Sequence, residues 1–340
     1  MTRKKIRRTL AARLGTFTVL GFGVLSAALA QTTLLNVSYD VTRELYKDIN
    51  PAFAAAYKAQ AGADVTVNQS HGGSSKQALS VAAGLEADVI TMNQAPDIDI
   101  LVTRGGLVAA DWRKQFPHDA APYTTTSVFL VRKGNPKAIK DWDDLARAGI
   151  EVIVPNPKTS GNGRYTYLAA WGYALDKGGE AAATDFVKRL FANVPVLDGG
   201  GRGATTTFTQ RGVGDVLVTF ENEAILIAKE LGGSKFDIVY PSQTIEAAAP
   251  VAVVKKVVAK RGTEKLARAY LDFLYSPAGQ EIIARHNFRP RDAAVLKKHA
   301  AKYPNVRTFT VEGKLGGWDK VQKTHFADGA LYDQIIVLKR

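Results

Sequence analysis

The chain has 340 residues, 46% of them hydrophobic, and no cysteine. Its formal net charge is +13, but six of the 45 Lys and Arg and none of the 32 Asp and Glu lie in residues 1–30, which leaves 39 against 32, or +7, for the remainder. The lack of cysteine excludes disulfides, thiol catalysis, cysteine-ligated zinc and a lipid-modified cysteine, and the modest remaining charge gives no support for nucleic-acid binding. The length suits about two domains.

Residues 1–30 have the features of a secretory signal peptide. Six basic residues precede the uncharged and mostly apolar stretch 14–30, and Ala28 and Ala30 form a small-x-small cleavage site before Gln31. An uncleaved membrane anchor is the alternative, but the apolar stretch is short for a span and rich in Gly, Thr and Ser. We therefore expect removal of this leader and export to the periplasm or cell envelope.

Segments typical of strands and helices alternate through most of the chain after the leader. The helix expected at 42–58 has Leu45, Ile49, Phe53 and Tyr57 at four-residue spacing, which gives it one apolar face. Such alternation predicts an α/β protein with a mainly parallel, doubly wound sheet in each domain. In chain order we expect strand 34–37, helix 42–58, strands 87–92 and 127–131, helices 142–145, 165–174 and 182–191, strand 215–220, helix 221–231, strands 236–240 and 249–254, and helices 263–275 and 277–285.

No run of Pro, Ser or Gly separates the chain into two halves. Two domains without a linker imply that the chain passes between them more than once. The segments 122–131 and 240–254 are the best candidates for these crossings.

Three short apolar runs each lead into a glycine-rich turn and then into a helical segment. They lie at 65–76, 152–164 and 194–203, and the first two have serine beside glycine. The first turn of a helix has unpaired N–H groups, the helix dipole favours negative charge, and glycine lets the backbone approach a ligand. One such turn is weak support, because ordinary strand-to-helix turns also use Gly and Ser. Three of them predict an anion-binding site.

Four basic residues flank these turns: Lys76, Lys158, Arg164 and Arg202. They could form direct ion pairs with an anion, or they could be solvated charges. We favour solvated charges, because neutral donors hold a buried dianion without the desolvation cost of a buried cation.

No pattern in the chain indicates catalysis. The five histidines are scattered, with no HExxH motif and no pair four residues apart, so we expect no metal site and no cofactor. The serines of the glycine-rich turns are not in a GxSxG motif. Two acidic pairs, Asp97 with Asp99 and Glu221 with Glu223, are expected to be solvated or to cap helices.

Several long motifs resemble the sulfate-binding proteins of bacterial ABC importers, among them SHGGSSK at 70–76 and PNPKTSG at 155–161. The resemblance covers nearly the whole chain after the leader, in order, and its motifs are long enough to be specific for that family. The similar segments are 34–46, 69–77, 129–137, 155–161, 168–175, 211–217, 275–281 and 288–291.

The resemblance implies a two-lobed periplasmic-binding-protein fold, in which each lobe is a sheet flanked by helices and at least two hinge crossovers connect the lobes. Residues 31–122 with 250–340 would form lobe 1, and residues 123–249 would form lobe 2. Such a protein is not an enzyme. It holds sulfate in the cleft between its lobes and delivers it to an ABC permease, and we expect it to be a monomer.

Carried over by position, the resemblance implies that neutral groups hold the anion. Asp40 would contribute its backbone N–H, and Ser74 its hydroxyl and its backbone N–H. Ser160 and Gly161 would bind at the start of the helix that follows residue 160. These residues lie in two of the glycine-rich turns and at the start of the first expected helix.

The chain departs from the family pattern at three further implied site residues. Asn162 is at a position that is usually glycine, and Gly201 is at one that is often alanine, but both keep the backbone N–H. Phe220 is at the position of a tryptophan whose indole N–H reaches the ligand. Phenylalanine has no donor, so this change bears directly on ligand binding.

Together these features predict an exported binding protein for sulfate, with thiosulfate as a second candidate ligand. Sulfate is fully ionised at neutral pH and needs only donors, whereas monohydrogen phosphate carries a proton that needs an acceptor. The alternatives are a binding protein for another tetrahedral oxyanion, such as molybdate or tungstate, and an envelope hydrolase that acts on phosphate or sulfate esters.

Overall fold

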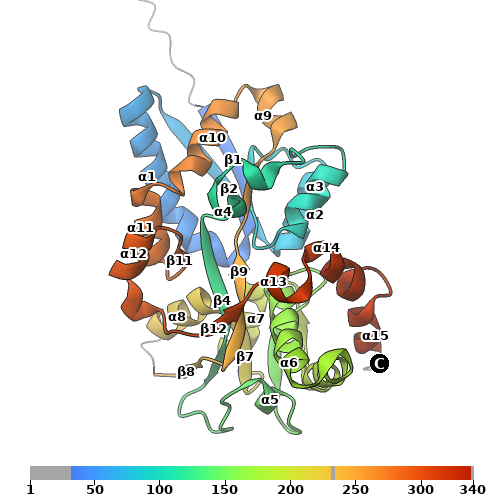
Figure 1. Cartoon of the computed structure of the whole chain (residues 1–340). Helices are drawn as coiled ribbons and strands as arrows, with labels where there is room; N and C mark the ends of the chain where they lie inside the picture. Colours follow the sequence, from blue (N-terminus) through green and yellow to red (C-terminus); the bar gives the residue numbers. More distant parts are fainter. Residues whose placement is uncertain (1–31, 231–233, 338–340) are drawn as a thin grey trace, which may run out of the picture. The chain divides into compact units, whose positions relative to one another are not determined.

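The computed structural model describes residues 32–230 and 234–337, so the predicted signal peptide at residues 1–30 lies outside the described residues. The described chain forms two sheets with helices packed on them (Figure 1). Among these residues, no helix is both long and apolar enough to pass through a membrane.

The first sheet has four strands in the order β10-β3-β1-β2. β1 pairs in parallel with β2 and β3, and β10 joins in the antiparallel direction. The strands are β1 (Thr32–Tyr39), β2 (Val65–Gly72), β3 (Val89–Thr91) and β10 (Val251–Val253). The helices grouped with it are η1 (Asp40–Thr42), α1 (Arg43–Ala61), α2 (Ser74–Ala82), α3 (Pro96–Thr103), η2 (Trp112–Lys114), α4 (Pro117–Ala120), α9 (Lys255–Arg261), α10 (Glu264–Phe273), α11 (Pro277–Arg285), α12 (Ala293–Lys298) and η3 (Ala300–Lys302).

The second sheet has eight strands, with the path β12-β9-β4-β7-β5-β6 and with β8 and β11 paired to β4. The strands are β4 (Tyr123–Arg132), β5 (Val152–Pro155), β6 (Leu197–Asp198), β7 (Val216–Phe220), β8 (Phe236–Val239), β9 (Gln243–Ala248), β11 (Arg289–Pro290) and β12 (Arg307–Phe309). Its helices are α5 (Trp142–Leu145), α6 (Gly161–Ala192), α7 (Gly201–Thr209), α8 (Glu221–Glu230), α13 (Val311–Leu315), α14 (Trp318–Val321), the π-helix η4 (Gln322–Phe326) and α15 (Leu331–Val337).

The direction of the strands differs between the two sheets. The long strand β4 runs antiparallel to β7, β8, β9 and β11, and the parallel pairs are β5 with β6, β5 with β7 and β12 with β9. A mainly parallel sheet is therefore confirmed for the first sheet and wrong for the second. One reason is that β4 carries the chain away from the first sheet and β9 carries it back to β10, so these two neighbouring strands run in opposite directions.

Side chains of β4 alternate between apolar clusters on the two faces of the second sheet. Phe129 and Val131 pack in the cluster that includes α6, which we call the α6 face, and Val128 and Leu130 pack with α7 and α8 on what we call the α7 face. The same alternation places Phe220 of β7 on the α6 face. A separate apolar cluster lies around the first sheet.

Most predicted elements are present, with bounds shifted by a few residues. The short helix predicted at 142–145 is α5, and the helices predicted at 165–174 and 182–191 are parts of α6, which is interrupted by non-helical backbone at Gly178 and Gly179. The elements that were not predicted are the strands β9, β11 and β12, the helices α3, η2, α4 and α9, and the helices after residue 292.

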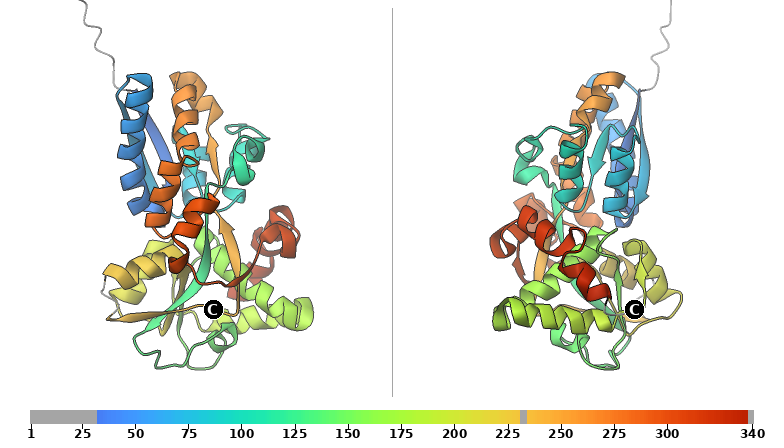
Figure 2. Two further views of the ribbon diagram at one scale, coloured as in Figure 1. Left: turned by 60° about the vertical axis from the view of Figure 1, so that its left-hand side comes forward. Right: turned by 90° about the vertical axis from the view of Figure 1, so that its right-hand side faces the viewer.

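The segment 307–337 joins the second sheet. β12 pairs with β9, and Val311, Trp318 and Phe326 pack in the same cluster as Tyr167 of α6. Figure 2 shows residues 307–337 beside α6. We expected residues 250–340 to belong with lobe 1, so the contacts correct that expectation for 307–337. The other lobe boundaries stay a prediction.

The chain passes between the two sheets in both segments where crossings were expected. Residues 121–122 lead from α4 into β4, and residues 249–250 connect β9 of the second sheet to β10 of the first. Movement about these crossings as hinges stays a prediction.

Candidate functional site

The three glycine-rich turns meet at Gly73. A Cβ atom added to Gly73 would lie 2.6 Å from the carbonyl oxygen of Thr159 and 2.7 Å from that of Gly199. The turns lead into α2, α6 and α7, so the N-termini of these three helices lie close together. Each end contributes N–H groups that have no partner within the helix, together with the positive end of its dipole. The region therefore suits an anion, because N–H donors come from α2, which follows a strand of the first sheet, and from α6 and α7, which follow strands of the second.

Asp40, at the start of η1, connects the first sheet to α7. Its Oδ2 accepts a hydrogen bond from the backbone N–H of Arg202 at 3.0 Å. The same oxygen would lie 2.5 Å from a Cβ atom on Gly200, so the carboxylate sits directly against the start of α7. Burial raises the pKa of Asp40, and the N–H group and guanidinium of Arg202 offset part of this rise.

The hydroxyl of Ser74 is already bonded within the protein. Its Oγ donates to Oδ2 of Asp97 at 2.5 Å and accepts from the backbone N–H of Asn93 at 3.3 Å. We expected both the hydroxyl and the backbone N–H of Ser74 to be available to a ligand. The structure leaves the backbone N–H at the start of α2 as the donor.

Asp97 is buried in the first turn of α3, so the expectation that it is solvated is wrong. Gln94 donates to its Oδ1 at 3.0 Å, which with the Ser74 hydroxyl gives the carboxylate two donors. Burial raises the pKa of Asp97, and the charge of Arg164 and the hydroxyl of Ser74 counteract this in part. Asp99, for which we expected the same environment as for Asp97, is half-buried and forms an ion pair with Arg113.

Ser160 and Gly161 form the start of α6. Oγ of Ser160 accepts the N–H of Gly163 at 3.4 Å and thereby caps the helix, which leaves the hydroxyl hydrogen for another acceptor. A Cβ atom on Gly161 would overlap the side-chain oxygen of Asn93, so the start of α6 lies directly against this side chain, and glycine at position 161 leaves the space that it occupies.

Asn93 was not predicted as part of this region. It follows β3, it is buried, and its Oδ1 has no hydrogen-bond partner in the structure. The sequence contains a signal that could have identified it. Ligands in open α/β sheets bind beyond the carboxyl ends of parallel strands, and Asn93 is a polar residue just after the carboxyl end of β3.

Asn162 and Gly201 lie against each other where α6 meets α7. Nδ2 of Asn162 donates to Oγ1 of Thr219 at 3.3 Å and would lie 3.2 Å from a Cβ atom on Gly201. The side chain of Asn162 is therefore packed between α7 and β7. What Asn162 and Gly201 can offer a ligand is their backbone N–H groups at the starts of two helices.

Phe220 is fully buried at the end of β7. Its ring meets that of Tyr165 edge to face at 6.0 Å, and it shares the α6-face cluster with Tyr39 and Val41, which flank Asp40. Thr219 points to the other face, toward Asn162, as alternation along a strand requires. Residue 220 therefore contributes an aromatic surface without a hydrogen-bond donor.

Three of the four cations beside the turns are paired with groups of the protein, which corrects the expectation of free, solvated charges. Lys158 donates to a carboxylate and two carbonyl groups, and Arg164 is buried and donates to the carbonyl of Pro157 at 2.8 Å. Arg202 pairs with Glu44 of α1 at 2.7 Å. Lys76 is exposed, as expected.

Glu221 and Glu223 in the first turn of α8 are also buried, so the expectation that they are solvated is wrong. Arg289 donates to both oxygens of Glu221, at 2.7 and 2.8 Å. Oε1 of Glu223 lies 3.1 Å from Nε of Arg202 and accepts the hydroxyl of Thr205 at 3.3 Å. Burial raises the pKa of Glu223 to about 7, although the charge of Arg202 opposes the rise.

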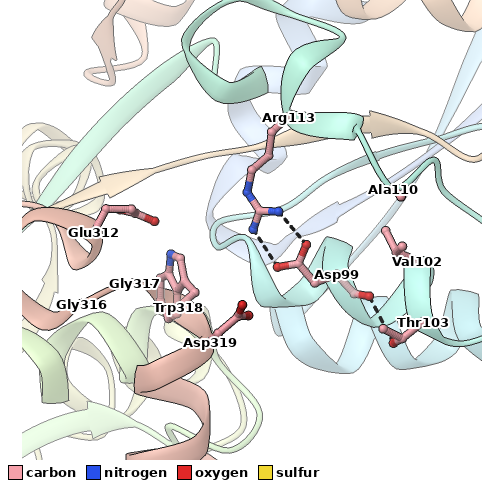
Figure 3. A pocket seen from close by; sticks show the side chains of 10 residues that line it. All are labelled: Asp99, Val102, Thr103, Ala110, Arg113, Glu312, Gly316, Gly317, Trp318 and Asp319. Carbon is pink, nitrogen blue, oxygen red and sulfur yellow. Dashed lines mark hydrogen bonds and ion pairs between the residues drawn. The ribbon is translucent and has the colours of Figure 1, made fainter.

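A cavity of about 450 Å³ lies elsewhere, between α3 and the segment that contains α14 (Figure 3). Arg113 points at Asp99 and donates to its two oxygens at 2.9 and 2.7 Å, and Glu312 and Asp319 add negative charge opposite. None of the seven predicted site residues lines this cavity, and its carboxylates do not suit an anion. In the described ranges, no three His, Asp or Glu residues are placed to hold a metal ion.

Comparison with known proteins gives consistent results. The model of the bacterial extracellular solute-binding protein family matches residues 34–289. The chain is 58% identical over 316 residues to the thiosulfate-binding protein of Pseudomonas aeruginosa, which covers 93% of this chain and 95% of that one. It is 56% identical over 304 residues to the sulfate-binding protein of Escherichia coli, with 89% and 92% covered.

Solved structures confirm the two-lobed periplasmic-binding-protein fold. The sulfate-binding protein SubI from Mycobacterium tuberculosis H37Rv has a TM-score of 0.79 and 37% identity, and the match covers 87% of this chain and 100% of that chain. A periplasmic thiamin-binding protein has a TM-score of 0.69 at 16% identity, which is a likeness of fold alone, with 91% and 97% covered. The chain therefore belongs to the bacterial extracellular solute-binding proteins, in the group that includes the sulfate- and thiosulfate-binding proteins.

Proposed function

We propose that this protein binds sulfate or thiosulfate where the N-termini of α2, α6 and α7 meet, and that it delivers the anion to an ABC permease. The observation that supports this most directly is the contact of Gly73 with the backbones of Thr159 and Gly199. Helix N-termini from both sheets meet there, which provides unpaired N–H groups and a favourable dipole field for a dianion.

Neutral donors would hold the ligand. The neighbouring cations Lys158, Arg164 and Arg202 already have protein partners, so the available donors are backbone N–H groups and the hydroxyl of Ser160. The nearby carboxylates of Asp40 and Asp97 already accept hydrogen bonds from Arg202 and Ser74. A region in which backbone N–H donors predominate favours a fully ionised anion over phosphate, whose remaining proton needs an acceptor; the unpartnered Oδ1 of Asn93 beside Gly161 is the acceptor that this proposal leaves unused.

Binding would stabilise the arrangement in which the two lobes are in contact. Asp40 and Ser74 come from the first sheet, and Ser160, Gly161, Asn162, Gly201 and Phe220 from the second, so a ligand held by both groups favours closure. The relatives are binding proteins and not enzymes, and no reaction is needed for this role. We further propose that residues 1–30 direct export to the periplasm and that the protein is a monomer.

Calorimetric titration tests the proposal. Protein freed of ligand by dialysis would be titrated with sulfate, thiosulfate, phosphate and molybdate at neutral pH. We expect tight binding of sulfate or thiosulfate and binding of phosphate at least a hundredfold weaker, which corresponds to about 2.7 kcal/mol. Comparable affinities for phosphate and sulfate would reveal an acceptor in the site and would contradict the proposal, as would preferential binding of molybdate.

A further inference from the structure

We infer that the C-terminal segment 322–333 sets the position of the anion-binding turn 157–163, and that Lys158 and Arg164 are positioning residues that connect the two. This inference rests on the proposed function, which makes 157–163 an anion-binding turn. The contacts that connect the C-terminal segment to the turn join protein atoms alone. It concerns residues that are far apart in the sequence and that only the folded chain brings together.

The ammonium group of Lys158 directs its hydrogen bonds at this segment. Its ammonium group donates to the carbonyl oxygen of Phe326 at 2.9 Å, to that of Ala327 at 3.3 Å and to Oδ2 of Asp333 at 2.9 Å. These bonds account for the three hydrogens of an ammonium group. Its backbone N–H donates to Oδ1 of Asn156, which ties the same residue into the turn.

Arg164 makes a second connection from the first turn of α6. Its Nε donates to the carbonyl of Pro157 at 2.8 Å, and one terminal nitrogen donates to Oε1 of Gln322 at 3.1 Å. The guanidinium also lies 5.1 Å from the centre of the Phe326 ring. Arg164 thus bridges the turn and η4, which begins the C-terminal segment.

The segment has its own anchors and can act as a fixed support. Phe326 and Tyr332 are buried in the α6-face cluster, and the hydroxyl of Tyr167 lies 3.1 Å from Nδ1 of His325. Oδ2 of Asp333 also accepts the N–H of Gly329 at 2.8 Å. The turn between β5 and α6 is therefore held between a packed helix and a packed C-terminal segment, which fixes the hydroxyl of Ser160 and the N–H group of Gly161, while the N–H of Ser160 donates to the carbonyl of Asn156 at 2.9 Å.

A general attraction of the two cations for the anion is the competing explanation, and the sign of one substitution separates the two. Asp333→Ala removes a negative charge beside Lys158. If the cations act only through their charge, this change leaves them less neutralised and strengthens anion binding. If they act by position, the freed Lys158 loosens the turn and weakens binding, by about threefold to thirtyfold.

The chain provides a matched control. Asp328 is fully exposed and lies 3.7 Å from the ammonium nitrogen of Lys158, so Asp328→Ala makes the same change in charge without removing a short hydrogen bond. Gln322→Ala alters no charge and removes the partner of Arg164. We expect weaker binding for Asp333→Ala and Gln322→Ala and an unchanged Kd for Asp328→Ala.

The experiment combines titration of sulfate and thiosulfate with amide hydrogen exchange of the ligand-free proteins. Faster exchange of the amides of residues 158–164 is expected in Asp333→Ala and Gln322→Ala, and wild-type exchange in Asp328→Ala. An unchanged or tighter Kd for Asp333→Ala, or wild-type exchange in that segment, would overturn the inference. Should the wild type bind neither anion, the proposed function fails, and the exchange data alone decide whether the C-terminal segment positions the turn.

Discussion

Replacing Gly73 with alanine tests whether the contact between the three turns controls ligand binding. The φ angle of Gly73 is −58° and ψ is 132°, values that alanine adopts without strain, so the effect of the change is steric. The new Cβ atom would lie 2.6 Å from the oxygen of Thr159 and 2.7 Å from that of Gly199. Ordinary contact begins at 3.4 Å, so the turns must separate by 3.4 − 2.6, or 0.8 Å, and by 3.4 − 2.7, or 0.7 Å.

Such a separation would break hydrogen bonds to a shared ligand. A bond of about 2.9 Å lengthened by this amount leaves the range of an effective N–H···O bond. Each hydrogen bond to a charged group contributes roughly 1.5–3 kcal/mol, so the loss of one such bond with weakening of a second predicts a loss of about 2–4 kcal/mol. This corresponds to a Kd raised about 30-fold to 1000-fold.

The assay is calorimetric titration of sulfate and thiosulfate, with thermal unfolding of the ligand-free protein as a second measurement. Gly199→Ala is the matched control, because a Cβ atom on Gly199 has no atom within 4 Å. We expect Gly73→Ala to lose affinity with little change in Tm, and Gly199→Ala to match the wild type in both. A Kd for Gly73→Ala within threefold of the wild-type value would refute the assignment of the site to these turns.

Three further predictions follow from the same structure. Ser160→Ala should weaken sulfate binding about tenfold to a hundredfold in titration, because the hydroxyl is the one side-chain donor in our proposed set, and an unchanged Kd would remove it from that set. Glu223, with a pKa raised by burial to about 7 from 4.5, keeps a proton in the folded protein that the unfolded chain loses. The contribution of this group to the free energy of unfolding, about 3 kcal/mol, is therefore present below about pH 4.5 and is lost as the pH rises through about 7. Urea unfolding at several pH values should show this decline in the wild type and not in Glu223→Gln. Phe220→Trp should lower the free energy of unfolding by about 1–3 kcal/mol, because residue 220 is fully buried against Tyr165 and the larger ring overpacks the α6 face; unchanged stability would indicate free space beside the ring, open toward the ligand.

Some positions show what local sequence determines. The turn at 70–76 and the cap at Ser160 are specified by neighbouring residues, since glycine, serine and the following helical pattern act within one turn of the chain. The same holds for α5, where Asp141 and Asp144 form a capping box around residues adjacent in sequence. The residues carried over from the family motifs, such as Asp40 and Gly201, also fall in these turns.

The partners of the charged residues were decided only by the tertiary structure. Nothing near Lys158 in the sequence indicates that Asp333 accepts its hydrogen bond, 175 residues later, and nothing near Arg202 indicates Glu44, 158 residues earlier. Charge alone predicts solvation for such residues. The burial that overrides this prediction depends on which surfaces the two sheets bring together.

The direction of strand pairing and the packing of residues 307–337 were likewise decided only by the tertiary structure. An apolar strand such as β4 has the same alternation whether its neighbours run parallel or antiparallel, so its sequence does not determine the direction of pairing. Likewise, residues 307–337 have short helices whose apolar side chains need a covering surface, and the sequence does not say which sheet supplies it. The sequence by itself thus determined the turns, the caps and the family of this protein. Contacts between residues far apart in the chain decided how its charges are paired and how Asn93 and Gly161 come together, because those contacts exist only once both sheets have formed.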